Sequence, residues 1–250
     1  MKTKEFNIMD EGVRLYAKME YPEMSNDKEI AIVLHGLAGN MEEHQIDTAA
    51  KAFRQCGMVS LRVDMQGHGN SDGLYAKHTL FKWISNICAV IDKVKEEGHT
   101  DIYLCGHSQG GLAAMFAAKM RIDDIKALVL LSPAVNICHG LMEGKFLGYS
   151  FDPLHVPQRL KVFDGWLDGD YFRTAQLLRP RDVAQCFAKE TLIVAAKEDE
   201  LVPLDELVQL QSQYPMGHLS MVEGNHCYDG HDDELSEVID DFIIRLKTVR

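Results

Sequence analysis

Hydrophobic positions follow two alternating patterns along the chain. Short apolar runs, many of them rich in β-branched residues, occupy 30–34, 59–64, 102–105, 127–131, 191–195 and 219–222. Most of these runs are apolar on both faces, which is typical of strands in a parallel sheet covered by helices. Segments with helical spacing between them predict helices over 44–55, 79–97, 109–120, 204–213 and 234–247. This alternation predicts an α/β fold with a mostly parallel central sheet flanked by helices.

Two segments depart from the alternation. Residues 1–20 predict an antiparallel hairpin that turns at 10–12. Residues 136–182 contain five glycines, three prolines and seven aromatic residues, and the segment is too long for a plain loop. We interpret it as an inserted cap over the carboxyl ends of the strands, where open α/β sheets bind ligands; the alternative is a structural excursion with its own small core. The chain is then a single domain, 1–250, with the cap at 136–182.

Composition narrows the classes of partner. The chain has 250 residues, with 26 basic and 38 acidic side chains and a net charge of −12. This acidic balance argues against nucleic acid and against anionic membranes as partners. No run of 18 apolar residues predicts a membrane span, and the N-terminus has no signal-peptide pattern, so we expect a cytoplasmic protein. The six cysteines form no C-x-x-C pair, which favours free thiols over zinc ligands, and we expect no metal.

One motif carries clear chemistry. The sequence Gly-His-Ser-Gln-Gly at 106–110 lies between a predicted strand and a predicted helix. In a strand–turn–helix context this pattern predicts a nucleophile elbow, in which Gly106 and Gly110 allow the tight turn and Ser108 projects its hydroxyl at the helix N-terminus. The other interpretation, an incidental serine in a glycine-rich helix start, does not account for this context. Ser108 is therefore the predicted nucleophile.

A serine hydroxyl needs a base to take its proton. In hydrolases with this elbow the partners follow in the order serine, acid, histidine. His226 lies just after the last predicted strand and before the last helix, at the carboxyl edge of the sheet, and is the predicted base. Four other histidines fit less well, because they open a strand, start the acidic helix, adjoin the serine or precede a glycine at a strand end: His218, His231, His107 and His35.

The acid that orients the base is predicted in the turn after the strand at 191–195. Asp199 lies in this turn, between Glu198 and Glu200. We favour Asp199 because a short side chain suits a fixed partner in a tight turn, and the two glutamates remain alternatives. The predicted oxyanion hole consists of the backbone N–H groups of Gln109 and Leu37, the latter in the loop at 35–39. No nucleotide-binding motif occurs there, and no cofactor is implied.

These motifs are similar to those of the α/β-hydrolase superfamily over essentially the whole chain. The resemblance rests on His35-Gly36, Asp64-Met65-Gln66-Gly67-His68-Gly69-Asn70-Ser71, Gly106-His107-Ser108-Gln109-Gly110, Asp199-Glu200-Leu201-Val202-Pro203 and Gly224-Asn225-His226. The second motif is typical of the branch that holds monoacylglycerol lipases, serine-aminopeptidase-like hydrolases and cinnamoyl (feruloyl) esterases. We interpret it as a structural turn in which Asp64 and Ser71 hydrogen-bond the backbone.

Within that branch the chain looks most like bacterial cinnamoyl esterases, on its loop at 35–40 and its segment at 169–176. The resemblance implies that Tyr171 contacts the phenolic hydroxyl of a substrate. The acidic cap residue of that family falls near Gly140 and has no acidic counterpart there. Trp166 is a second candidate for aryl packing. Packing within the cap is the alternative role for both side chains.

The predicted function is a serine carboxylic-ester hydrolase that acts through an acyl-enzyme, with a small-molecule ester as its partner. The residues themselves support acyl transfer to water, and the hydroxycinnamate (feruloyl) substrate follows from the resemblance. Three alternatives stay open: a lipase for monoacylglycerols or short aliphatic esters, an aminopeptidase-type hydrolase, and a non-catalytic aryl-binding protein that keeps the fold. A dehalogenase fits less well, because its nucleophile is normally an aspartate.

Overall fold

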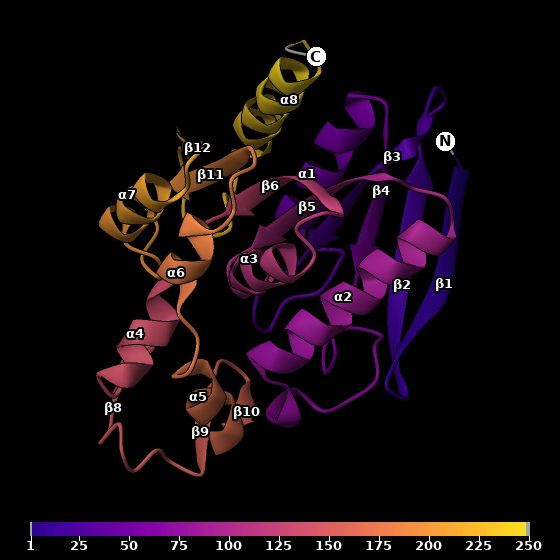
Figure 1. Ribbon diagram of the computed structural model, residues 1–250. Coiled ribbons are helices and arrows are strands. Elements are labelled where there is room, and N and C mark those ends of the chain that lie inside the picture. The colour runs from indigo at the N-terminus through magenta and orange to yellow at the C-terminus, as the bar shows by residue number, and fades with distance from the viewer. Residues whose placement is uncertain (1, 249–250) are drawn as a thin grey trace.

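The structure, a computed structural model, describes residues 2–248. Its main sheet has eight strands within those residues, in the order β1-β2-β4-β3-β5-β6-β11-β12 (Figure 1). The strands are β1 Lys2–Asp10, β2 Val13–Tyr21, β3 Asn26–Leu34, β4 Met58–Val63, β5 Asp101–His107, β6 Ile125–Leu131, β11 Thr191–Ala196 and β12 Gly217–Val222. The six strands from β3 to β12 in this sheet are parallel to one another, so their carboxyl ends share one edge.

The first two strands form the predicted hairpin. Its turn is Glu11-Gly12, where both residues have positive φ angles, and β2 then pairs antiparallel with β4. Each apolar run of the sequence is a strand, although β3 begins four residues before the predicted start at Ile30. Strand β5 continues to His107, two residues beyond its predicted end, and delivers the chain directly to Ser108.

Helices cover both faces of the sheet. Helices α1 (His44–Gln55) and α8 (Asp232–Thr248) pack on one face, and α2 (Leu80–Glu96) and α3 (Gln109–Met120) pack on the other (Figure 1). Alternate residues of one strand supply the two cores: Ile30 and Ile32 face α2 and α3, whereas Ala31 and Val33 face α1 and α8. Burial on both faces explains why these strands are apolar throughout. Helix α7 (Leu204–Gln213) connects β11 to β12.

The segment at 136–182, hereafter the inserted segment, lies between β6 and β11 at one end of the molecule (Figure 1). It begins with α4 (Asn136–Met142), β7 (Lys145–Phe146) and β8 (Tyr149–Ser150). It continues with β9 (Arg159–Val162), β10 (Gly165–Asp168) and α5 (Gly169–Ala175), and it ends within α6 (Pro180–Gln185). A 3-10 turn, η1 (Tyr75–Lys77), packs against β10. Four aromatic rings of the segment pack on one another and extend the core on the α2 and α3 face: Phe146, Phe151, Tyr171 and Phe172.

Within residues 2–248, no helix combines the length and the apolar character needed to cross a membrane.

Candidate active site

Ser108 occupies the turn between β5 and α3. Its backbone has φ 53° and ψ −120°, a conformation that side-chain-bearing residues rarely adopt and that holds the side chain above the helix start. The flanking glycines are required by close packing: a Cβ on Gly110 would lie 2.3 Å from the His35 carbonyl oxygen, and one on Gly106 would lie 2.6 Å from the Gly110 backbone. The elbow predicted from the sequence is therefore present in the backbone.

His226 and Asp199 come from the loops after β12 and β11. The Nδ1 atom of His226 lies 2.8 Å from Oδ2 of Asp199, whose side chain is only 2% exposed. The other carboxylate oxygen accepts the backbone N–H groups of Leu201 and Val202, each at 2.9 Å. Burial raises the pKa of Asp199, but the hydrogen bonds from His226 and the two amides outweigh it, so the net shift is downward. Glu198 and Glu200, the alternatives left open by the sequence, are exposed.

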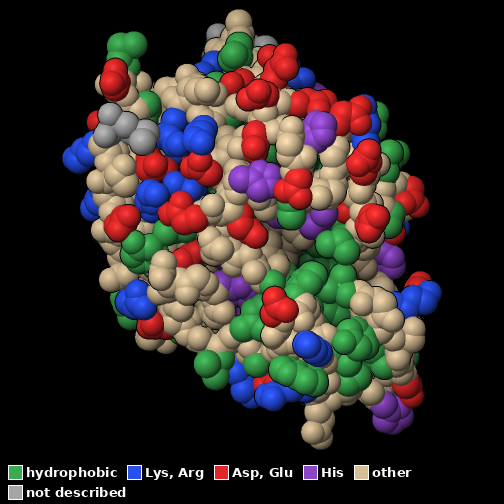
Figure 2. Space-filling view, turned by 180° about the vertical axis from the view of Figure 1, so that it is seen from behind, with side chains coloured by type: hydrophobic (Ala, Val, Ile, Leu, Met, Phe, Trp, Pro, Cys, Tyr) green, Lys and Arg blue, Asp and Glu red, His purple; other side chains and the backbone are tan. Residues whose placement is uncertain are grey.

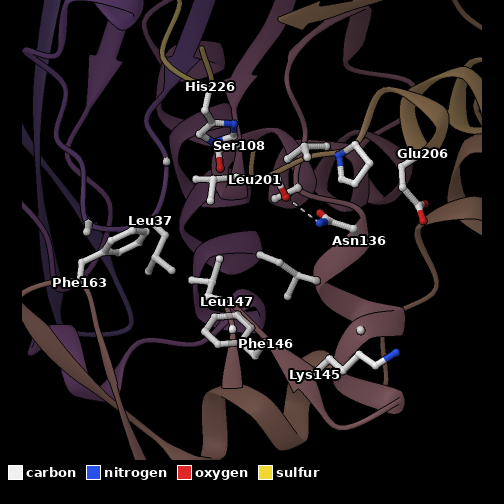
Figure 3. A pocket seen from close by; sticks show the side chains of 18 of the residues that line it. Leu37, Ser108, Asn136, Lys145, Phe146, Leu147, Phe163, Leu201, Glu206 and His226 are labelled. Atoms are coloured by element: carbon white, nitrogen blue, oxygen red, sulfur yellow. Dashed lines mark hydrogen bonds between the residues drawn. The ribbon is translucent and has the colours of Figure 1, made fainter. Parts of the chain in front are cut away.

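The His226 loop is held to the sheet from below. Tyr228 is fully buried, and its hydroxyl donates to the Val194 carbonyl at 3.0 Å while the Ser132 hydroxyl donates to it at 2.9 Å. The backbone N–H of Glu198 also donates to the Gly224 carbonyl, which joins the two loops that carry Asp199 and His226. Figure 3 shows the result: the His226 ring lies directly over the Ser108 side chain.

His107 belongs to this site, although sequence reasoning considered it only as a competing base. It is buried, its Nε2–H donates to the His226 carbonyl at 2.9 Å, and its ring centre lies 4.8 Å from that of His226. Burial lowers the pKa of His107 to about 3, so it stays neutral and cannot serve as a proton store at ordinary pH. Its position before the nucleophile, at the end of a strand, is the signal that places it beside the base.

The loop after β3 supplies the predicted oxyanion position. A Cβ on Gly36 would lie 3.1 Å from the Ser108 Cβ, so Leu37 begins beside the nucleophile. The loop is fixed by two neutral imidazoles: His35 accepts the Met65 N–H at 2.9 Å, and His68 accepts the Ala38 N–H at 3.1 Å. Burial lowers the pKa of His35 to about 4 and that of His68 to about 3, which keeps both as acceptors. His35, set aside as a candidate base in the sequence, thus holds this loop in place.

The Asp64–Ser71 turn is also structural, as predicted. Asp64 accepts the N–H groups of Met41 at 2.8 Å and Asn70 at 2.7 Å, and the Ser71 hydroxyl donates to the Asp64 carbonyl. The turn thereby fastens the loop after β3 to the loop after β4.

Gln109, the residue after the nucleophile, is the first residue of α3, and the first four N–H groups of a helix have no partner within it. Its buried side chain is held at both ends: Oε1 accepts the Tyr171 hydroxyl at 2.7 Å, and Nε2 donates to Nε2 of His78 at 3.2 Å. His78 can accept because its Nδ1–H donates to the Tyr75 carbonyl at 2.6 Å. This chain of hydrogen bonds ties the inserted segment to the residue predicted to form half of the oxyanion hole.

A cavity of about 700 Å³ opens above Ser108. The sheet side contributes Leu37, Ser108 and His226, and the inserted segment contributes apolar walls: Ile137, Phe146, Leu147, Tyr149 and Phe163. In Figure 3, Phe146 and Leu147 lie on the far side of Ser108 from His226, and Leu37 and Phe163 are drawn on the left of the cavity. Hydrophobic side chains also gather on the lower right of the face in Figure 2.

The two predicted substrate contacts lie elsewhere. Tyr171 is 0% exposed and is engaged with Gln109, and Trp166 is 50% exposed on β10; neither is among the residues that line the cavity. The structure therefore does not bring Tyr171 to the cavity as the resemblance implied, because the side chain is buried against Gln109 and His78. Trp166, the second candidate for aryl packing, faces outward. The aromatic residue that does reach the cavity from the same hairpin is Phe163, which has a positive φ of 53° in the turn between β9 and β10.

Comparison with known proteins agrees with this geometry. Residues 25–208 match the model of the family described as serine aminopeptidase, S33. The chain belongs to this family of serine hydrolases. Its fold is the α/β-hydrolase fold: it superposes with a TM-score of 0.93 on Est1E from Butyrivibrio proteoclasticus, in a structure with ferulic acid bound, at 40% identity over 96% of this chain and 98% of that one.

A more distant relative of this serine hydrolase is the mouse palmitoyl-protein thioesterase ABHD10, mitochondrial. It is 23% identical over 236 residues, which span 87% of this chain and 76% of the thioesterase. The solved structure of mouse ABHD10 superposes with a TM-score of 0.77 at 18% identity, covering 98% of this chain and 100% of that one, and shows a shared fold. The chain is accordingly a serine hydrolase of the carboxylic-ester class, as the sequence predicted.

Proposed function

We propose that this serine esterase cleaves esters of hydroxycinnamic acids, such as feruloyl esters. The observation that carries the proposal is the 40% identity, over nearly the whole of both chains, with an Est1E structure that holds ferulic acid. The apolar wall of the cavity supports it, because Phe146 and Phe163 offer aromatic faces of the kind on which an aryl ring packs.

In the proposed reaction Ser108 Oγ attacks the ester carbonyl while His226 Nε2 takes its proton. The N–H groups of Leu37 and Gln109 donate to the oxyanion that forms, and Asp199 stabilises the imidazolium. His226 then passes the proton to the alcohol oxygen as the C–O bond breaks, which leaves the acyl group on Ser108. Water, deprotonated by His226, repeats the attack, releases the acid and restores the serine.

In this proposal the inserted segment is the cap of the site, and its apolar wall is the acyl pocket. Two arrangements support that reading. The wall lies on the side of Ser108 away from His226 (Figure 3), and the Tyr171–Gln109 hydrogen bond couples the segment to the elbow. An acyl group placed there leaves the alcohol on the His226 side, within reach of the proton donor.

The first test compares initial rates on ethyl ferulate and ethyl butyrate with one purified preparation. We expect a higher kcat/KM on the ferulate, and loss of both activities in Ser108→Ala. A clear preference for butyrate would overturn the aryl substrate and favour an aliphatic ester hydrolase. Ferulate binding without turnover of any ester would favour a non-catalytic protein.

A matched pair of aromatic variants tests the acyl pocket. Phe163 and Trp166 lie on one hairpin and are 51% and 50% exposed, but only Phe163 lines the cavity. Phe163→Ala should lower kcat/KM on ferulate about tenfold, the loss expected from removing roughly 1.4 kcal/mol of aryl packing, and should affect butyrate less. Trp166→Ala should change neither rate. The reverse result would restore Trp166 as the aryl contact.

A further inference from the structure

The two sides of Ser108 differ in chemistry. The apolar wall lies on the side away from His226 (Figure 3). On the His226 side the cavity is lined by Gly36, Ala38, Glu43 and Cys227, from the loop after β3 and the loop after β12. The alcohol part of an ester must lie on this side, because His226, which takes the proton of Ser108, also has to protonate the departing alcohol oxygen. The group that this side presents to the alcohol is a carboxylate.

Glu43 is half-buried and lines the cavity. Its carboxylate covers Gly39, since a Cβ on that glycine would lie 2.2 Å from Oε2, and it is close enough to His226 and Cys227 to act on both electrostatically. Its carboxylate accepts a long hydrogen bond from Nε2 of Gln45 at 3.4 Å; burial raises the pKa of Glu43, and a hydrogen bond from the Asn40 backbone partly offsets that shift. It is the residue before α1, but its side chain does not cap that helix.

Three carboxylates line the cavity, and two of them are neutralised. Glu143 pairs with Lys145 at 3.0 Å, and Glu206 pairs with both His139 and Arg181 at 3.3 Å. Within residues 2–248, no lysine, arginine or histidine nitrogen lies within 4.0 Å of the Glu43 carboxylate. A half-buried carboxylate without a cationic partner is costly, and a ligand that donates further hydrogen bonds lowers that cost.

We propose that Glu43 forms the subsite for the leaving alcohol, where it accepts hydrogen bonds from alcohols that carry further hydroxyl groups and repels alcohols that carry a negative charge. The inference rests on the proposed acyl-enzyme reaction, which places the alcohol beside His226, but not on the identity of the acyl group. A sugar or another neutral polyol satisfies the carboxylate through its hydroxyl protons, whereas an anionic alcohol brings two negative charges together in a half-buried cavity.

The test keeps the acyl group constant and varies the charge of the alcohol. The substrates are ethyl ferulate (neutral), feruloylcholine (cationic), carboxymethyl ferulate (anionic) and a feruloyl arabinose ester (neutral polyol). The same series is made with butyrate, so that failure of the ferulate proposal, seen as low rates on all ferulates, remains separate from the effect of the alcohol. The quantity compared is the ratio of kcat/KM values within one acyl series.

We expect the wild type to favour the cationic over the anionic ester and the polyol over the ethyl ester. Glu43→Gln removes the charge but keeps an acceptor oxygen, so the cation-to-anion ratio should fall on the order of tenfold, as expected for one unit charge several ångströms away at a partly exposed site. Glu43→Asp keeps the charge and should keep the preference for the cation.

Glu42→Gln is the matched control. It removes the same charge one residue earlier, from a side chain that does not line the cavity and that pairs with Lys18 and Arg62. Its cation-to-anion ratio should equal that of the wild type. The proposal is overturned if Glu43→Gln leaves the ratio unchanged while the variant retains the wild-type Tm, or if Glu42→Gln lowers the ratio equally.

Discussion

Replacing Asp199 with asparagine should disable the base while leaving the site in place. The two carboxylate oxygens have different partners: Oδ1 accepts the N–H groups of Leu201 and Val202, and Oδ2 faces His226 Nδ1. In the variant the amide oxygen must stay opposite the two backbone donors, so the NH2 group turns to His226. Nδ1 then has to accept, the ring proton moves to Nε2, and Nε2 can no longer take the proton of Ser108.

The size of the effect follows from the geometry. At an effective dielectric constant of about 20, two unit charges separated by the observed 2.8 Å interact by about 6 kcal/mol. That attraction exists only once His226 is charged, so its loss raises the barrier rather than weakening substrate binding. Each 1.4 kcal/mol corresponds to about tenfold in rate, which predicts a fall in kcat of about four orders of magnitude with KM nearly unchanged.

The assay is steady-state hydrolysis of the better of ethyl ferulate and ethyl butyrate, with Tm as the check on folding. Glu200→Gln is the control, since it removes an exposed carboxylate from the same turn and should keep kcat within about twofold. A folded Asp199→Asn enzyme that retains more than about a tenth of wild-type kcat would refute the triad assignment. A loss confined to Glu200→Gln would return the acid role to the alternative weighed from the sequence.

Two further outcomes test the surroundings of the site. Tyr171→Phe leaves the buried Gln109 Oε1 without its donor and should cost about 1–3 kcal/mol of stability, seen as a lower Tm. The variant should also have a severalfold lower kcat at unchanged KM for ferulate. A selective rise in KM for phenolic substrates would instead make Tyr171 a substrate contact. Acid should destabilise the fold below about pH 6.5, because burial lowers the pKa values of four histidines to about 3 to 4: His35, His68, His78 and His107. As the pH falls, the unfolded chain therefore binds protons at these histidines before the folded protein does. Each histidine contributes a slope of about 1.4 kcal/mol per pH unit between its unfolded and folded pKa values, so the urea midpoint should fall steadily from about pH 6.5 to about pH 5. A flat profile would contradict the buried neutral state.

The sequence predicts those site residues whose positions are determined by the strands of the sheet and the turns that follow them. Ser108 was identified because its glycine neighbours are demanded by a turn whose geometry leaves no room for a Cβ. His226 and Asp199 follow the last strands of a parallel sheet, and parallel strands bring their carboxyl ends to one edge. Helices α1, α3 and α7 begin and end at the predicted residues, because each lies between two sharply bounded strands.

The contacts that depend on tertiary packing were not predictable in the same way. Residues 136–182 have aromatic residues without a periodic pattern, so the sequence does not indicate which of them face the cavity. Tyr171 resembles a substrate contact by motif, yet its neighbours in the fold bury it against Gln109. The sequence also does not indicate that Glu43 has no cationic partner, because this depends on tertiary contacts in which the nearby cations pair with Glu143 and Glu206: Lys145, His139 and Arg181.

Acyl specificity and alcohol specificity should be able to change separately in this enzyme. The groups proposed for proton transfer are fixed by the sheet edge and by buried anchors such as Tyr228, whereas the walls proposed for the acyl group and for the alcohol come from a separate segment and from one half-buried side chain. Substitutions at Phe163 should alter acyl preference at constant alcohol preference, and substitutions at Glu43 should do the converse. Because no hydrogen bond or ion pair joins these two residues, the effects on the free energy of the transition state should add in the double variant. A marked departure from additivity would mean that the two walls of the cavity move together, and that the inserted segment adjusts to the alcohol as well as to the acyl group.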